Sequence, residues 1–249
     1  SGLKPSPPAD QRTLMRRLYF DLIGLPPTPD RFQRFIDDKS PRAYENMVET
    51  LFANAHHGEK MAIAWLDVVR FADTIGYHSD NPRNVWPYRD WVIDSFNKNK
   101  RFDRFTLEQF AGDLLPDATA EQKVATCFHR NHMTNGEGGR DPEESRIDYV
   151  IDRVSTTGTL WLGLTLGCCQ CHSHKYDPIT QEEYYRMFAF LNNDHESSMV
   201  AYSPTEQRLR DQLARQIREE EERLRHTTPD WETRMAAWEA SVRGDQPEW

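Results

Sequence analysis

Apolar residues recur along the chain at the three- and four-residue spacing of one helix face. Leu14, Leu18 and Leu22 stand four apart and predict an amphipathic helix that begins at Gln11 and ends at Gly24. The same spacing predicts further helices over residues 28–37, 40–55, 59–71, 90–97, 106–115, 120–130, 145–164 and 181–191.

Helix-breaking residues divide this pattern into separate helices. His56, His57 and Gly58 are expected to end one helix before the next begins. No alternation of apolar and polar residues runs longer than about four positions, so the sequence does not predict β-strands. The predicted fold class is therefore mostly α, an irregular multi-helix domain with long ordered loops.

The character of the chain changes after Pro204. Leu209, Leu213 and Ile217 form a narrow apolar stripe among charged residues, which is typical of a helix that forms half of a hairpin. A second helix is predicted after Asp230. We therefore expect an extended lead-in over residues 1–10, one main domain over residues 11–200, and a helical stem over residues 201–249 that leads towards a downstream domain.

Composition narrows the classes of function. The net charge is −9, the pI is near 5.5 and no run of lysines and arginines stands out, which argues against nucleic acid as a partner. No apolar stretch approaches the roughly 20 residues that a membrane span needs. The chain begins without a signal peptide, and Ser1-Gly2 is typical of a scar left by tag cleavage.

Three of the four cysteines lie within four positions, in the stretch Gly167-Cys168-Cys169-Gln170-Cys171-His172. Cys168, Cys171 and His172 have the C-x-x-C-H spacing of a c-type haem attachment site. Two thiols one turn apart can each form a thioether to the porphyrin, and the adjacent imidazole can bind the iron. The motif thus predicts one covalently attached haem c in the main domain.

Other chemistries fit the same residues. Thiolates and imidazoles at Cys168, Cys171, His172 and His174 are also suitable ligands for a structural zinc ion. A C-x-x-C pair can also act as a redox dithiol. Haem attachment takes place outside the cytoplasm, so the haem interpretation implies an exported protein, located in the periplasm or cell envelope.

If haem is bound, His172 is the proximal ligand. The motif does not specify the sixth iron ligand, which must come from elsewhere in the chain or from solution. The candidates are His129 and His132, which flank the start of a glycine-rich loop, and His78, in an aromatic loop. His174 is too close to His172 to reach the opposite haem face. A second histidine favours electron transfer, whereas an open position favours chemistry on a small molecule.

Several segments taken together resemble a family of cytochrome-c-like domains first noted in planctomycete proteins and long described as of unknown function. The resemblance covers residues 11–195. The matching stretches are residues 16–29, 65–73, 88–93, 109–116, 137–139, 152–154 and 163–178, the last of which reads Gly-Leu-Thr-Leu-Gly-Cys-Cys-Gln-Cys-His-Ser-His-Lys-Tyr-Asp-Pro. Ser173 departs from the aspartate expected between the two histidines, and Cys169 stands where alanine is usual.

The resemblance implies export and a larger parent chain with a partner domain downstream. It also suggests redox partner proteins and an association with carbohydrate-derived substrates. A catalytic site in such a domain would draw on Glu137 as acid or base, Arg153 to stabilise negative charge, and His174 and Tyr176 near the motif. The alternatives are an internal ion pair for Arg153 and simple packing for His174 and Tyr176.

The sequence therefore predicts an extracytoplasmic mono-haem redox module. It would act as a haem-dependent oxidoreductase together with a partner domain, or as a pure electron-transfer module with six-coordinate haem. The remaining alternative is a non-catalytic interaction domain with a structural zinc ion at the Cys/His cluster.

Overall fold

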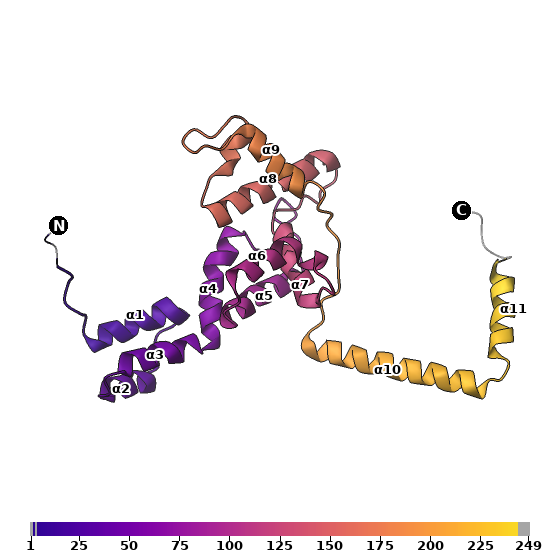
Figure 1. Ribbon diagram of the computed structural model, residues 1–249, viewed down its shortest axis with the longest axis horizontal. Coiled ribbons are helices and arrows are strands. Elements are labelled where there is room, and N and C mark those ends of the chain that lie inside the picture. The colour runs from indigo at the N-terminus through magenta and orange to yellow at the C-terminus, as the bar shows by residue number, and fades with distance from the viewer. Residues whose placement is uncertain (1, 3, 244–249) are drawn as a thin grey trace. The chain divides into compact units, whose positions relative to one another are not determined.

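The computed structural model describes residue 2 and residues 4–243, and in these residues it is mostly helical with long loops between the helices, as the sequence predicts. Its elements include no strand, and one isolated β-bridge joins Thr74 and Pro82. Figure 1 shows the helices: α1 (Gln11–Ile23), α2 (Pro29–Asp37), α3 (Ala43–Phe52), α4 (Ala55–Val68), α5 (Trp86–Asn97), α6 (Phe102–Ala111), α7 (Ala120–Ala125), α8 (Pro142–Thr157), α9 (Gln181–Leu191), α10 (Pro204–Thr227) and α11 (Trp231–Arg243).

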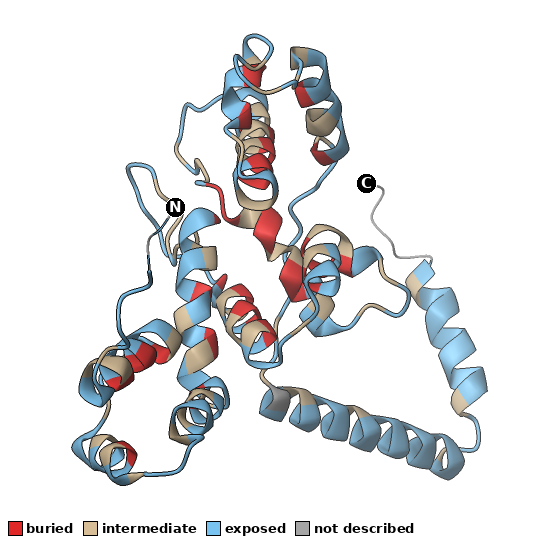
Figure 2. Cartoon of the chain, turned by 60° about the vertical axis from the view of Figure 1, so that its left-hand side comes forward, coloured by how far each residue is buried: buried red, intermediate tan, exposed pale blue. Residues whose placement is uncertain are grey.

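The chain divides into two compact units, Ser1–Ser198 and Met199–Trp249. The division falls two residues before the predicted one. The buried residues lie in the first unit, on the inner faces of its helices (Figure 2). The candidate site therefore lies in the first unit.

Helices α1, α2 and α3 enclose a small core of their own. Asp10 caps α1 by accepting hydrogen bonds from the backbone N–H groups of Arg12 and Thr13, and Gly24 ends it in the left-handed region with φ 72°. The core contains Met15, Leu18, Tyr19, Ile23, Phe35 and Leu51. Burying such side chains stabilises the fold by about 1.5–3 kcal/mol each.

The prediction that residues 56–58 end a helix is wrong, because they lie inside α4. Asn54 caps α4 by accepting from the N–H of His56, so these residues form the first turn of α4. Gly58 lies against α5: its N–H donates to Asn97 Oδ1 at 2.8 Å, and a Cβ on it would lie 2.4 Å from the Ile93 carbonyl oxygen. The ring of His57 hydrogen-bonds the Leu22 carbonyl in α1 at 3.0 Å. The glycine permits close helix packing here and does not end a helix.

Other helix ends differ from the predicted ones by several residues. Helix α5 starts at Trp86, because Pro87 is tolerated in a first turn. Helix α6 spans residues 102–111 and not 106–115. The predicted helix over 120–130 continues after α7 as a 3₁₀-helix, η2 (Thr126–Arg130), and α8 continues as a π-helical turn, η3 (Gly158–Leu162).

Helices α8 and α9 lie side by side and hold the cysteine-rich segment (Figure 1). After η3 the chain turns at Gly163, in the left-handed region with φ 65°, and enters a short 3₁₀-helix, η4 (Leu166–Gln170). The core between these elements contains Val150, Val154, Leu166, Cys169, Tyr184 and Leu191. A Cβ on Gly158 would lie 2.3 Å from the Leu166 side chain, so a glycine is required where η4 packs on α8.

The second unit contains α10 and α11. Ser203 and Glu206 form a reciprocal capping box at the start of α10. The predicted stripe residues Leu209, Leu213 and Ile217 are exposed, and α11 has no buried residue. Among the described residues, no helix combines the length and apolar character that crossing a membrane requires.

Candidate functional site

The thiol of Cys168 lies in η4, and Cys171 is the residue that follows its last turn. Both residues are exposed and neither forms a disulfide. Both thiols are therefore accessible from solvent.

Cys169 has the opposite orientation. Its side chain is fully buried in the core between α8 and α9, with Sγ 3.9 Å from the Ile179 carbonyl oxygen. It anchors η4 in the core, whereas Cys168 and Cys171 are exposed. The structure thus separates the three clustered cysteines into one packing residue and two accessible ones.

His172 follows the second accessible thiol and is also exposed. Its Nδ1 lies 2.8 Å from the Ser173 carbonyl oxygen. Because a carbonyl oxygen only accepts, this contact places the proton on Nδ1 and leaves the Nε2 lone pair for a metal. Within the described residues Nε2 has no hydrogen bond. The ring is therefore in the tautomer that a proximal iron ligand needs.

His174 shapes the turn that follows the motif. Its Nδ1 accepts the backbone N–H groups of Asp177 at 2.9 Å and Tyr176 at 3.3 Å, and its own N–H donates to the Ile179 carbonyl at 2.8 Å. Its side chain is only 10% exposed. The Asp177 carboxylate oxygen Oδ2 also lies 3.1 Å from Nδ1. In this arrangement Nδ1 of His174 is engaged within the protein and organises the backbone of the turn.

Tyr176 and Gln170 lie on either side of His172 and His174 in the sequence, and their contacts differ. The Tyr176 side chain is 83% exposed, and the Lys175 ammonium lies 5.2 Å from the centre of its ring. On the other side, the Gln170 carbonyl oxygen accepts from the Gln181 amide and the Tyr185 hydroxyl, both at 3.0 Å. These bonds tie η4 to α9 and fix the position of the motif.

His132 lies in the interior, and both of its ring nitrogens are engaged. Nδ1 is 2.8 Å from the Met133 carbonyl oxygen and Nε2 is 2.6 Å from Glu196 Oε1. Its ring stacks on Tyr149 with centroids 4.2 Å apart. The carbonyl oxygen only accepts, so Nδ1 donates to it, while Nε2 faces the Glu196 carboxylate and, at 3.4 Å, the Arg153 guanidinium.

Arg153 lies beside His132 and pairs with the same carboxylate. Its guanidinium donates to Glu196 Oε1 at 2.7 Å and to the His129 carbonyl oxygen at 2.8 Å. Burial alone would raise the pKa of Glu196, but the hydrogen bond from His132 and the charges of His132, Arg153 and Arg130 outweigh it, and this pKa is lowered. Arg153 thus forms the internal ion pair that the sequence analysis offered as the alternative to a catalytic role.

His129 is buried near this cluster. Nε2 is 3.4 Å from the Phe110 carbonyl oxygen, and Nδ1 is 3.5 Å from Asp194 Oδ2 but makes no hydrogen bond within the described residues. Burial lowers the pKa of His129 more than Asp194 raises it. The ring is therefore held in its neutral form.

Glu137 and His78 lie in the two long loops. Glu137 Oε1 accepts the Ser79 N–H at 3.2 Å and is 3.9 Å from His78 Nδ1. The loops are also joined by a backbone bond from Thr134 to Ile75 at 2.8 Å. The His78 side chain is 92% exposed, so this histidine keeps its mobility and its access to solvent.

The predicted site residues thus fall into three groups. The first is the accessible trio Cys168, Cys171 and His172, with His174 and Tyr176 in the next turn. The second is His129, His132 and Arg153, and the third is Glu137 with His78. No hydrogen bond or ion pair joins these groups within residues 4–243. Within the same residues, the structure has no group of three or more His, Cys, Asp or Glu side chains arranged to hold a metal ion.

The sequence analysis missed the residues that organise the buried group. Glu196 and Asp194 follow α9 in a segment without a motif. Arg83 donates to the carbonyl oxygens of Arg130 and His132 at 2.9 and 2.8 Å, and so fixes the chain that carries the two histidines. Arg83 lies in the same aromatic loop as His78, and no local pattern marks it for this role.

Comparison with known families identifies the chain. A family model described as PSCyt2, protein of unknown function (DUF1549), matches residues 1–196, so the chain belongs to this family. No curated protein and no solved structure matches it significantly.

Proposed function

We propose that this member of the PSCyt2 family is an extracytoplasmic c-type haem module that transfers electrons. Cys168 and Cys171 would hold the porphyrin through two thioethers, and His172 would bind the iron through Nε2. A bound haem supplies reversible one-electron oxidation and reduction of its iron.

One observation carries the proposal. The two thiols with C-x-x-C spacing and the imidazole that follows are accessible together, while the third cysteine of the cluster is buried. A zinc ion needs four ligands that converge on one point, whereas His174 uses its Nδ1 within the protein. Covalent haem needs only the two thiols and one imidazole nitrogen.

The chain's own residues would tune the iron through the proximal ring. The hydrogen bond from His172 Nδ1 to the Ser173 carbonyl oxygen fixes the ring orientation and raises the basicity of Nε2. Because a backbone carbonyl accepts this proton, the bond does not depend on an aspartate at position 173. The serine at this position is therefore compatible with the proposed ligand.

The sixth ligand would come from His78 or from solution. His132 uses both ring nitrogens internally, and His129 is buried between Phe110 and Asp194. His78 is exposed on a loop and holds no closer partner than Glu137 at 3.9 Å. Of the three histidines, it is the one whose ring is not held in the interior.

Electron transfer is favoured over catalysis on a carbohydrate-derived substrate. The proposed catalytic residues Glu137 and Arg153 lie in separate groups, and Arg153 is committed to Glu196. Electron transfer requires only a held haem and contact with a redox partner, such as a downstream domain of the parent chain. An oxidoreductase would require a further group of polar residues from that partner domain.

The test is haem retention after denaturation. The protein would be produced by export in a bacterium able to attach haem, denatured, separated on a gel and stained for haem. We expect the wild type to retain haem, and the double variant Cys168→Ser/Cys171→Ser to lose it. Cys127→Ser, a half-buried cysteine outside the motif, is the matched control and should retain it.

Two outcomes would overturn the proposal. One is a wild type that contains zinc and no iron, and the other is haem staining that persists in the double variant. Carbon monoxide then separates the two redox roles. A ferrous spectrum that does not change on its addition indicates six-coordinate haem and electron transfer, whereas a shifted spectrum favours the oxidoreductase.

A further inference from the structure

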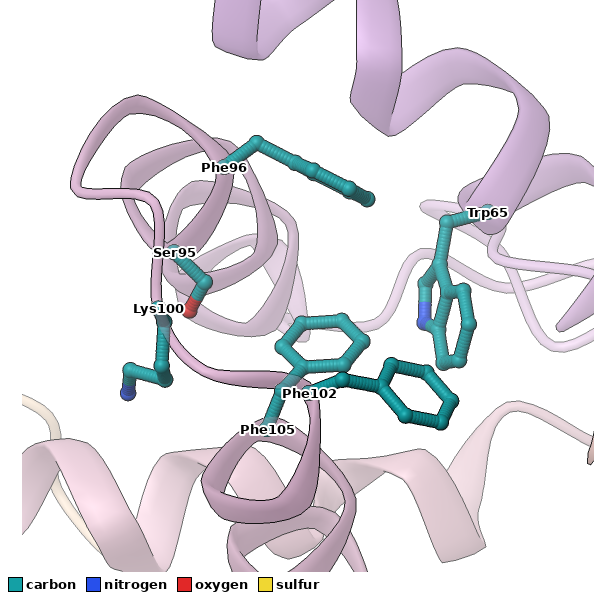
Figure 3. Close-up of a pocket in the computed structure, with 6 residues that line it drawn as sticks. All are labelled: Trp65, Ser95, Phe96, Lys100, Phe102 and Phe105. Carbon is teal, nitrogen blue, oxygen red and sulfur yellow. The ribbon is translucent and has the colours of Figure 1, made fainter.

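A pocket lies between α4, α5 and α6, away from the cysteine motif in sequence. Its volume is about 150 Å³. Figure 3 shows the rings of Trp65, Phe102 and Phe105 gathered around one space with Phe96 opposite, while the Lys100 ammonium points away from it. The lining residues are Trp65, Ser95, Phe96, Lys100, Phe102 and Phe105.

We propose that this pocket binds a small, neutral molecule with a single apolar ring. The proposal is independent of haem, because none of the lining residues belongs to the motif or to its supporting bonds. Its support is the shape of the pocket together with the state of the polar groups in its wall.

Every side-chain polar group in the lining has a partner in the protein. Ser95 Oγ donates to the Trp91 carbonyl oxygen at 2.7 Å, and Trp65 Nε1 donates to Gln109 Oε1 at 3.2 Å. Lys100 Nζ forms an ion pair with Glu108. The Ser95 and Trp65 donors are therefore used within the protein, and only the lone pairs of Ser95 Oγ remain in the lining. An anionic ligand would find no free donor on Ser95 or Trp65 and would lose its hydration without compensation.

The contacts of Lys100 determine which part of this side chain lines the pocket. The Lys100 ammonium lies 4.6 Å from the centre of the Trp91 ring, on the side where it also meets Glu108. This cation–π contact and the ion pair hold the lysine stem along the pocket. The lysine thus contributes apolar methylene groups to the lining and directs its charge elsewhere.

The size of the pocket selects the ligand. Apolar cavities of about 150 Å³ stay dry and accept benzene-sized molecules. Trp65 and Phe105 already meet edge to face, with centroids 4.7 Å apart, and a further ring can make the same contact. Phe102, whose side chain is 63% exposed, lies at the solvent side and can move to admit a ligand.

Benzene is the probe for this pocket, because it has the required size and no atom that would bind iron. We expect saturable one-to-one binding to the full chain by calorimetry, and a melting temperature that rises with benzene concentration. Benzoate has the same ring and one carboxylate. It should bind at least about tenfold more weakly, because the carboxylate would lose its hydration and would find no free donor on Ser95 or Trp65.

A filling variant gives the structural control. Ser95 is the smallest lining residue, so Ser95→Leu should occupy the pocket and abolish benzene binding. Ser6→Leu makes the same change at an exposed position and should bind as the wild type does. If Ser95→Leu loses its helical circular dichroism, Phe102→Ala replaces it, and benzene binding should weaken several-fold because one ring of the wall is lost.

The proposal would be overturned by binding that does not saturate, by benzoate binding as tightly as benzene, or by full benzene affinity in both pocket variants. Each of these results would mean that the ring molecule associates elsewhere on the protein.

Discussion

Nε2 of His132 lies 2.6 Å from Oε1 of Glu196, although 64 residues separate them in the chain. The carboxylate also accepts from Arg153 at 2.7 Å. One carboxylate thus pairs with both side chains, and it ties the segment after α9 to the loop before α8. Removing its charge would leave the buried Arg153 guanidinium without its anionic partner.

The first prediction concerns this carboxylate. Glu196→Gln keeps the shape of the side chain but removes its charge, so we expect the free energy of unfolding to fall by about 2–3 kcal/mol. Urea denaturation followed by circular dichroism measures the change. The matched control is Glu182→Gln, which breaks the exposed pair with Arg186 and should cost less than about 0.5 kcal/mol. Equal losses in the two variants would contradict the interior role of Glu196.

The second prediction concerns pH. The pKa of His129 is lowered from its ordinary value of 6.5, so the unfolded chain binds more protons there and stability falls as the pH drops below about 6.5. The pKa of Glu196 is lowered from 4.5, so its contribution is present above that pH and is lost as the pH falls through the folded-state value. Denaturation curves from pH 8 down to about pH 3 should therefore show two successive losses, the first below about pH 6.5 and the second below about pH 4.5.

The variant His129→Gln separates the two effects. It has no titrating ring at this position, so its stability should change less than that of the wild type between about pH 6.5 and 5. A wild-type profile that stays flat down to pH 4.5 would show that burial of His129 has no energetic consequence.

Local signals in the sequence were sufficient for the helices that carry their own caps. Helix α9 was predicted with both ends correct, because Thr180 and Glu183 form a capping box that depends on neighbouring residues alone. The prediction of a helix break at residues 56–58 is wrong because Gly58 packs against another helix, where its N–H donates to Asn97. Propensity treats such a glycine as a helix breaker, whereas tertiary packing requires it.

The candidate site divides in the same way. The C-x-x-C-H motif lies within five consecutive residues, so spacing was enough to single out Cys168, Cys171 and His172 as candidates. That Cys169 is the buried member depends on the register of η4 against α8 and α9, which spacing does not contain. Glu196 was missed because its partners lie on another segment and no local pattern marks a carboxylate that will be buried there.

A third prediction tests the close approach of α4 and α5. In Gly58→Ala, the added Cβ would lie 2.4 Å from the Ile93 carbonyl oxygen and 2.5 Å from the Asn97 side chain, so the helices must separate. We expect a loss of about 2 kcal/mol or more in the free energy of unfolding. Gly138→Ala is the control, because its Cβ meets nothing within 4 Å, and it should stay within about 0.5 kcal/mol of the wild type.

The last prediction separates packing from ligand attachment within the cysteine cluster. Cys169→Ser places a hydroxyl among Val150, Val154 and Tyr184, where only the Ile179 carbonyl oxygen, 3.9 Å from the present sulfur, is near. We expect the free energy of unfolding to fall by about 1–3 kcal/mol, because the hydroxyl is buried without a well-placed partner. Haem retained on the denatured chain should nevertheless equal that of the wild type. Loss of haem in folded Cys169→Ser, with retention in Cys168→Ser/Cys171→Ser, would instead assign attachment to the buried thiol and contradict the orientation of η4.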